Sequence, residues 1–153
     1  MPASVLAKPT GVSLNANGTV SVVARATDTD GNAAVKDKIA QPDNVKYSES
    51  MRTLFIGEDG TGHLNNYVWA YNIDTKVLSR VLAVPAGGEC TGLQAVDNLN
   101  DFAYVMSAMQ HLGDWTWNAT QSAAGGLKEK VAANWGGVMK QSANGYIALP
   151  VLK

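Results

Sequence analysis

Two acidic side chains stand together between glycines in residues 57–63 (GEDGTGH). Calcium takes several oxygen ligands from an adaptable backbone, and the carboxylates of Glu58 and Asp59 on a glycine-rich loop would supply such ligands. An ordinary surface loop contains the same residue types, because glycine and aspartate are common in turns. The segment therefore predicts either a site for a hard cation or a plain exposed loop.

A third acidic position, Glu89, lies in the glycine-rich residues 87–92 (GGECTG) between two apolar runs. Glycines allow a ligand to approach the backbone closely, although they also form ordinary turns. The neighbouring Cys90 has the chemistry of a metal ligand or a nucleophile, but a lone buried cysteine usually packs as a small apolar side chain. We therefore keep Glu89 as a candidate ligand in a turn and leave the role of Cys90 open.

Other catalytic signatures do not occur in the sequence. Two histidines, His63 and His111, and one cysteine cannot build a structural zinc site. There is no Gly-x-Ser-x-Gly motif of a serine hydrolase, no Walker loop and no dinucleotide-binding fingerprint. Trp115 and Trp117 would share one face of a strand, as part of a core or as a platform for a sugar.

The composition limits the class of partner. The chain has 153 residues, enough for one domain, and 46% of them are hydrophobic. Its 12 basic and 13 acidic side chains leave no basic excess to hold a phosphate backbone, so we expect no nucleic-acid partner. No apolar run approaches the roughly 20 residues of a membrane span. One cysteine excludes an internal disulfide framework.

Short strands separated by turns must position these residues. An Asn-Gly pair at residues 17–18 predicts a hairpin between residues 12–14 and 19–24. Further β-branched and aromatic runs predict strands over residues 45–47, 53–57, 67–73, 77–84, 93–96 and 102–107. Antiparallel hairpins at this spacing indicate an all-β fold, which is a sandwich, a barrel or a propeller.

The C-terminal region has a different pattern. Leu127, Val131 and Trp135 recur every four residues within 121–135, which predicts a short helix that the glycines at 136–137 end. Residues 146–153 are apolar and strand-like, and an apolar strand normally pairs with a neighbour. They suit a strand that closes a sheet, or a piece of a larger protein.

Five motifs, taken in order, resemble the C-terminal part of the PhoX-type alkaline phosphatase family, which are bacterial exported β-propeller proteins. They are PDN at 42–44, LFIGEDG at 54–60, NYVWAY at 66–71, GECTGL at 88–93 and QHLGDW at 110–115. The resemblance covers about residues 40–117, and members of the family are much longer than this chain. It implies that residues 1–153 form a single β-rich unit, a fragment that carries the last propeller blades.

The same resemblance implies a periplasmic or secreted location. The chain itself begins without a signal peptide, because residues 5–7 form too short an apolar run and no basic stretch precedes them. A propeller piece has open sheet edges, and strand exchange with a second copy would cover them. We therefore expect a strand-exchanged homo-oligomer.

Enzymes of this family hydrolyse phosphate monoesters with a calcium- and iron-containing cluster held mainly by carboxylates. By resemblance, Glu89 matches the family's metal-ligand glutamate, Glu58 is expected as a second ligand and Asp59 as a third. Supporting positions next to the ligands are expected at Asp43, Asn44 and His111. The implied cofactors are calcium, with iron in the intact cluster, and the implied substrates are phosphorylated small molecules.

The sequence departs from the family pattern at two places. The family has a basic residue that grips phosphate just before the Glu-x-Thr-Gly motif, where this chain has Gly87 and Gly88, and its Gln-His-Pro-Gly is Gln-His-Leu-Gly here. We therefore expect a fragment of a calcium- and iron-dependent phosphatase-like hydrolase that is inactive by itself. The alternatives are a non-catalytic β-propeller module stabilised by calcium, and an interaction scaffold in which the polar loops are plain turns.

Overall fold

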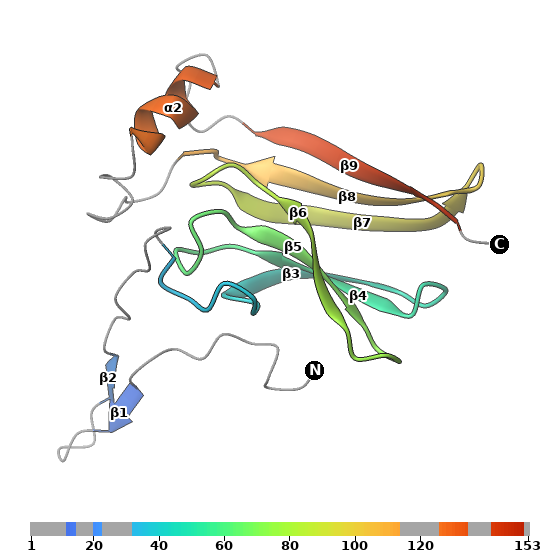
Figure 1. Cartoon of the computed structure of the whole chain (residues 1–153), viewed down its shortest axis with the longest axis horizontal. Helices are drawn as coiled ribbons and strands as arrows, with labels where there is room; N and C mark the ends of the chain where they lie inside the picture. Colours follow the sequence, from blue (N-terminus) through green and yellow to red (C-terminus); the bar gives the residue numbers. More distant parts are fainter. Residues whose placement is uncertain (1–11, 15–19, 23–31, 114–125, 135–141, 152–153) are drawn as a thin grey trace.

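The computed structural model describes residues 12–14, 20–22, 32–113, 126–134 and 142–151 (Figure 1). Within these residues the protein is mainly β, with antiparallel sheets and one short helix near the C-terminus, which confirms the expected fold class. The predicted hairpin is present as β1 (Val12–Leu14) and β2 (Val20–Val22), in which Val12 is opposite Val22. No helix in this part of the chain is long and apolar enough to cross a membrane.

A four-stranded antiparallel sheet is formed in chain order. Its strands are β3 (Pro42–Ser48), β4 (Thr53–Glu58), β5 (Tyr67–Asn72) and β6 (Leu78–Ala83). Alternation of apolar side chains gives the sheet two apolar faces. Phe55 and Val68 lie on one face, and Ile56 and Trp69 on the other.

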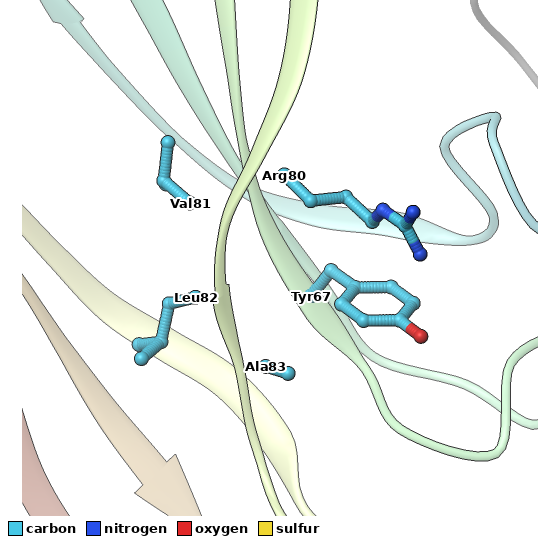
Figure 2. Close-up of a pocket in the computed structure, with 5 residues that line it drawn as sticks. All are labelled: Tyr67, Arg80, Val81, Leu82 and Ala83. Atoms are coloured by element: carbon cyan, nitrogen blue, oxygen red, sulfur yellow. The ribbon is translucent and has the colours of Figure 1, made fainter.

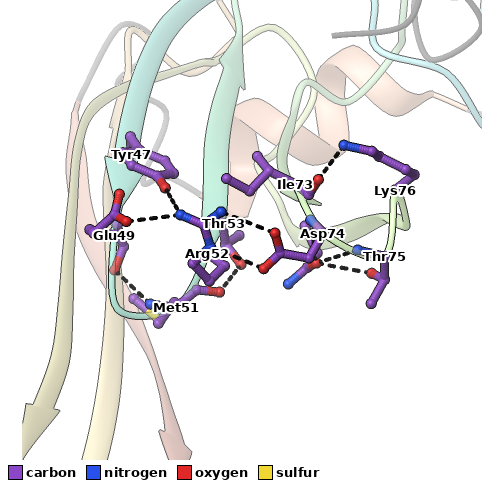
Figure 3. Close-up of polar contacts among 11 residues, drawn as sticks. Tyr47, Glu49, Met51, Arg52, Thr53, Ile73, Asp74, Thr75 and Lys76 are labelled. Carbon is purple, nitrogen blue, oxygen red and sulfur yellow. Dashed lines mark hydrogen bonds and ion pairs between the residues drawn. The ribbon is translucent and has the colours of Figure 1, made fainter.

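The turn between β3 and β4 and the turn between β5 and β6 are joined by polar contacts at the same end of the sheet, as Figure 3 shows. Arg52, which has a positive φ of 50°, bonds through Nε to Asp74 Oδ2 at 3.0 Å and through Nη1 to Glu49 Oε1 at 2.8 Å. The same Nη1 donates to the hydroxyl of Tyr47 at 3.0 Å. Because these groups are exposed to water, the network fixes the geometry of the turns but adds little to stability.

A three-stranded antiparallel sheet forms the second layer in Figure 1. It has the order β7 (Glu89–Leu99), β8 (Phe102–Gln110) and β9 (Ala143–Pro150). The expected C-terminal strand is therefore present, and it pairs with β8 over eight residues without a register shift. The helix α2 (Leu127–Asn134) precedes β9 within the predicted 121–135, while the glycines at 136–137, Trp115 and Trp117 lie outside the described residues.

The two larger sheets pack on each other through β3, β4 and β7. The core between them contains Phe55 and Val68 from the four-stranded sheet and Cys90, Leu93 and Val105 from the three-stranded sheet. On the far face of the four-stranded sheet, Ile39 packs on Ile56, Trp69 and Tyr71, while Val45 and Tyr47 of β3 remain exposed.

Candidate functional site

Glu58, the last residue of β4, is directed into the protein and is fully buried. Its Oε1 accepts hydrogen bonds from the Ala40 backbone N–H and the Trp69 indole Nε1, both at 2.7 Å. Its Oε2 accepts from the Tyr67 backbone N–H at 3.0 Å and lies 2.9 Å from His63 Nδ1. Both oxygens are thus occupied by protein donors from four separate positions of the chain.

His63 completes this buried ion pair. Its Nδ1 faces the Glu58 carboxylate, while its Nε2 lies 3.1 Å from the carbonyl oxygen of Val35. Because both ring nitrogens face acceptors, both must donate, which only the charged imidazolium can do. Burial of the ring lowers its pKa, but the hydrogen bond and charge of Glu58 raise it more, so the His63 pKa lies above its usual value.

Hydrogen bonds with residues 33–41 fix the conformation of the glycine-rich residues 57–63. The N–H groups of Ala33 and Ala34 donate to the Gly62 carbonyl at 2.8 and 2.7 Å. The Gly62 N–H donates to Gln41 Oε1 at 2.7 Å, and the Asp59 N–H to the Gln41 carbonyl at 3.1 Å. This part of the sequence is therefore a fixed structural loop around Glu58, with Asp59 on its exposed side.

Glu89 lies in a different place from the turn that its sequence predicted. It is the first residue of β7, opposite Gln110 of β8, and is 8% exposed. Burial raises its pKa above the usual value, and the hydrogen bond and charge of Asp59 raise it further, with a smaller contribution from Asp43. His111, whose Nε2 is 3.6 Å from Glu89 Oε1, lowers this pKa in part.

Asp43, Asp59, Glu89 and His111, which we call the carboxylate cluster, come from four elements that meet at one end of the sheets. β3 and β7 begin there, and β4 and β8 end there, as the pairings of Pro42 with Glu58 and of Glu89 with Gln110 require. In the described part of the chain, His111 Nδ1 is buried and has no hydrogen-bond partner. The cluster combines carboxylate oxygens with a polar atom that has spare bonding capacity.

Asn44 joins the strands that carry the cluster. Its Nδ2 donates to Asp43 Oδ2 at 2.6 Å and to the Cys90 carbonyl at 3.4 Å. Thr91 Oγ1 donates to Asn44 Oδ1 at 3.4 Å. Asn44 therefore fixes the start of β3 against the start of β7, on which Glu89 lies.

Cys90 belongs to the core between the sheets. It is fully buried, and burial is the main reason why its pKa is raised to about 12. A thiol with this pKa is protonated near neutral pH and is a poor nucleophile. Its backbone also makes a close approach to β4, since a Cβ on Gly57 would lie 2.5 Å from the Cys90 carbonyl oxygen.

The sequence-derived ligand set separates into two groups. Asp59 and Glu89 interact directly, with Asp43 and His111 near them, whereas the Glu58 carboxylate is bound by backbone, indole and imidazole donors. Among the described residues, no three His, Cys, Asp or Glu side chains form a group that could hold a metal ion. Asp59 and Glu89 fit calcium as two carboxylate ligands, and further ligands would have to come from elsewhere.

A shallow hollow on β5 and β6 had no clear signal in the sequence (Figure 2). It has a volume of about 220 Å³ and is lined by Tyr67, Arg80, Val81, Leu82 and Ala83. The Arg80 guanidinium carbon lies 5.3 Å from the centre of the Tyr67 ring, and Nη2 lies 3.3 Å from Asp37 Oδ1. The Arg80 guanidinium therefore stacks on the Tyr67 ring and is paired with the Asp37 carboxylate. An anionic ligand in the hollow would have to compete with Asp37 for this positive charge.

Comparison of the chain with protein-family models, with curated proteins and with solved structures found no match.

Proposed function

We propose that this chain is part of a metal-dependent, phosphatase-like hydrolase that acts on phosphate monoesters, similar to the PhoX-type family, and that it contributes calcium ligands from the carboxylate cluster. The observation that carries the proposal is the nearly buried Glu89, whose pKa is raised by burial and by Asp59 beside it. Two carboxyl groups held together in this way repel each other when both are ionised. A divalent cation between them would remove that repulsion.

The donor set favours calcium over a softer metal. Asp59, Glu89 and Asp43 offer carboxylate oxygens, which hard cations prefer, while Cys90 is buried in the core as a protonated thiol. When bound, calcium would neutralise charge on the oxygens of a phosphate group. Iron, as the second cofactor of the complete cluster, would need ligands from outside the described residues.

The arrangement of the sheets agrees with a piece of a propeller. β3 and β7, the first strands of the two larger sheets, pack side by side, and the sheets face each other as neighbouring blades do. The carboxylate cluster lies where these first strands begin. Residues on first strands and their loops would line the central channel of a propeller, and export to the periplasm or beyond belongs to the same proposal.

One observation favours a second candidate, a non-catalytic module that calcium stabilises. Where the family has a basic residue that grips phosphate, this chain has Gly87 and Gly88, and neighbouring atoms leave little space for a side chain at either glycine. A Cβ on Gly87, which has a φ of 79°, would lie 2.6 Å from the Gly113 Cα, and one on Gly88 would lie 2.5 Å from Leu112 Cδ2. No basic side chain fits at either position without a shift of the backbone or of Leu112.

Thermal melting of the whole chain, with chelator and then with calcium, tests both candidates. A ligand at about 100 times its Kd stabilises the folded state by about 2.7 kcal/mol, which raises the melting midpoint by about 5–10 °C. We expect this shift in the natural chain and in the control E129Q, whose glutamate is exposed on α2, and its loss in E89Q. If calcium leaves the midpoint of the natural chain unchanged, the proposal that this chain binds calcium is wrong.

Phosphate release separates the enzyme from the calcium-stabilised module. In the complete protein, an enzyme would lose hydrolysis of p-nitrophenyl phosphate on E89Q, whereas a structural calcium site would lose only thermal stability. Hydrolysis that is retained in E89Q would contradict the phosphatase proposal. We expect this chain alone to release no phosphate, because no complete set of metal ligands is present among its described residues.

A further inference from the structure

The three-stranded sheet is apolar on both faces. On the inner face, Leu93, Val105 and Cys90 are buried against the four-stranded sheet. On the opposite face, which we call the outer face, directly opposite residues form three cross-strand rows. The rows are Leu99–Phe102–Pro150, Val96–Tyr104–Ala148 and Gln94–Met106–Tyr146.

Large apolar side chains on the outer face are exposed. Tyr146 is 66% exposed, Leu99 55%, Phe102 40%, and Val96 and Met106 39% each. The rings of Tyr104 and Tyr146 lie with their centres 5.8 Å apart, which makes a continuous aromatic surface across β8 and β9. None of the nine residues in the three rows is charged.

A sheet with one face in water normally alternates apolar and polar residues. β8 does not, since Phe102, Tyr104 and Met106 face outward while Val105 faces the core. The exposed parts of the outer-face side chains amount to about 500 Å², near the upper end of the apolar patches found on monomers. Two such faces in contact would bury about 1,000 Å², the size at which specific interfaces begin.

We propose that the outer face packs against the outer face of a second copy of this chain, so that two three-stranded sheets stack across a two-fold axis. A two-fold interface requires a surface that is complementary to itself. The outer face is compatible with its own copy in charge, because the nine residues of its three rows are uncharged and would not repel each other. Its Met, Tyr and Phe side chains are residue types that are enriched in protein interfaces. The inference concerns this chain by itself and rests on residues outside the carboxylate cluster, since in a complete propeller a further blade would cover the same face.

The mass of the whole chain in solution, measured over a range of concentrations by sedimentation equilibrium, tests this proposal. We expect a reversible dimer. M106K places an ammonium group in the central part of the stacked faces, and we expect it to raise the dimer dissociation constant about a hundredfold or more. V45K, at a valine that is exposed on the other sheet, is the matched control and should leave the dimer unchanged.

A second variant keeps the test decisive if M106K fails to fold, as judged by circular dichroism. Y146K lies in the same row at a side chain that is mostly exposed, so it should fold and also dissociate the dimer. Pairing of two copies through the edge strand β9 would leave Met106 in water, so a dimer that persists in both variants overturns face-to-face stacking. A natural chain that stays monomeric at every concentration overturns the proposal and leaves the face to another partner.

Discussion

At the scale of single residues, the two glutamates that we predicted as metal ligands have different environments. Glu58 is fully buried and bound by donors from Ala40, His63, Tyr67 and Trp69, so its charge is compensated within the protein. Glu89 is nearly buried but has another carboxyl group, Asp59, as its neighbour. Glu58 therefore stabilises the fold as it stands, while Glu89 is the group that gains from a cation.

We expect E58Q to destabilise the chain strongly. The substitution leaves the His63 imidazolium buried without its counter-charge, and breaking one partner of a buried ion pair costs about 3–5 kcal/mol. The melting midpoint should fall by about 10 °C or more. E49Q, which removes an exposed partner of Arg52, is the control and should shift the midpoint by little. A midpoint for E58Q equal to that of the control would refute the role given to this pair.

The His63–Glu58 pair also predicts a pH dependence. The pKa of His63 is raised in the folded state, so the stability that the pair contributes is fully present below the unfolded pKa of about 6.5 and is lost as the pH rises through the folded value. Urea unfolding at a series of pH values should therefore give a free energy of unfolding that declines above about pH 6.5. In H63Q this decline should be absent; its persistence would assign it to another group.

In the metal-free chain, we expect ionised Glu89 to destabilise the fold, whereas the His63–Glu58 pair stabilises it; the same linkage rule applies to both. Its pKa is raised, so the favourable contribution of the protonated carboxyl is present below the unfolded pKa and is lost as the pH rises through the folded value. Near neutral pH the ionised Glu89 therefore destabilises the chain. In chelator, E89Q should melt above the natural chain, while in calcium this order should reverse. An E89Q chain that melts lower in chelator would show that the carboxylate is already compensated.

At the scale of secondary-structure elements, the sequence predicted where strands exist better than where they begin. The runs at 53–57, 67–73 and 77–84 became β4, β5 and β6 because β-branched and aromatic side chains suit a pleated, buried surface. β7 begins at Glu89, four residues before the predicted strand at 93–96. The prediction missed this start because GGECTG has the composition of a turn. Its extension depends on pairing with β8 and contact with β3, which no local pattern contains.

The candidate site was predictable in part for the same reason. The resemblance brought Asp43, Asp59, Glu89 and His111 into one prediction, and the strand ends place them near one another. The burial of Glu58 could not be predicted, because its donors come from positions 40, 63, 67 and 69 and converge only in the folded chain. The glycines on both sides of Glu58 and Asp59 gave no sign of this burial, because they are as typical of an exposed loop as of a metal site.

The contact between β4 and β7 gives a prediction at this scale. A Cβ on Gly57 would lie 2.5 Å from the backbone oxygen of Cys90, so G57A must push the two sheets apart. We expect a loss of about 2 kcal/mol or more in the free energy of unfolding, measured with urea. G145A in β9 is the matched control, because its Cβ would meet only the flexible end of Met109 at 3.2 Å. Equal losses in the two variants would contradict this account of Gly57.

At the scale of the whole molecule, two layers differ in how completely they are covered. The four-stranded sheet buries one apolar face against the second sheet, and on its other face Ile56, Trp69 and Tyr71 are buried with Ile39. The three-stranded sheet has the same two-faced character but leaves Phe102, Met106 and Tyr146 exposed. A partner that covers this face should therefore stabilise the whole chain.

This requirement links stability to concentration. If a second copy covers the outer face, binding favours the folded state, so the melting midpoint must rise with protein concentration. For a Kd well below the working concentration, each tenfold increase adds about 1.4 kcal/mol to the stability of the dimer, a shift of a few degrees in scanning calorimetry. M106K should remove the dependence and melt at the midpoint that the natural chain approaches on dilution, because its side chain is exposed in the monomer. A midpoint of the natural chain that does not vary with concentration would mean that folding of this chain needs no second copy, and that its outer face is tolerated in water.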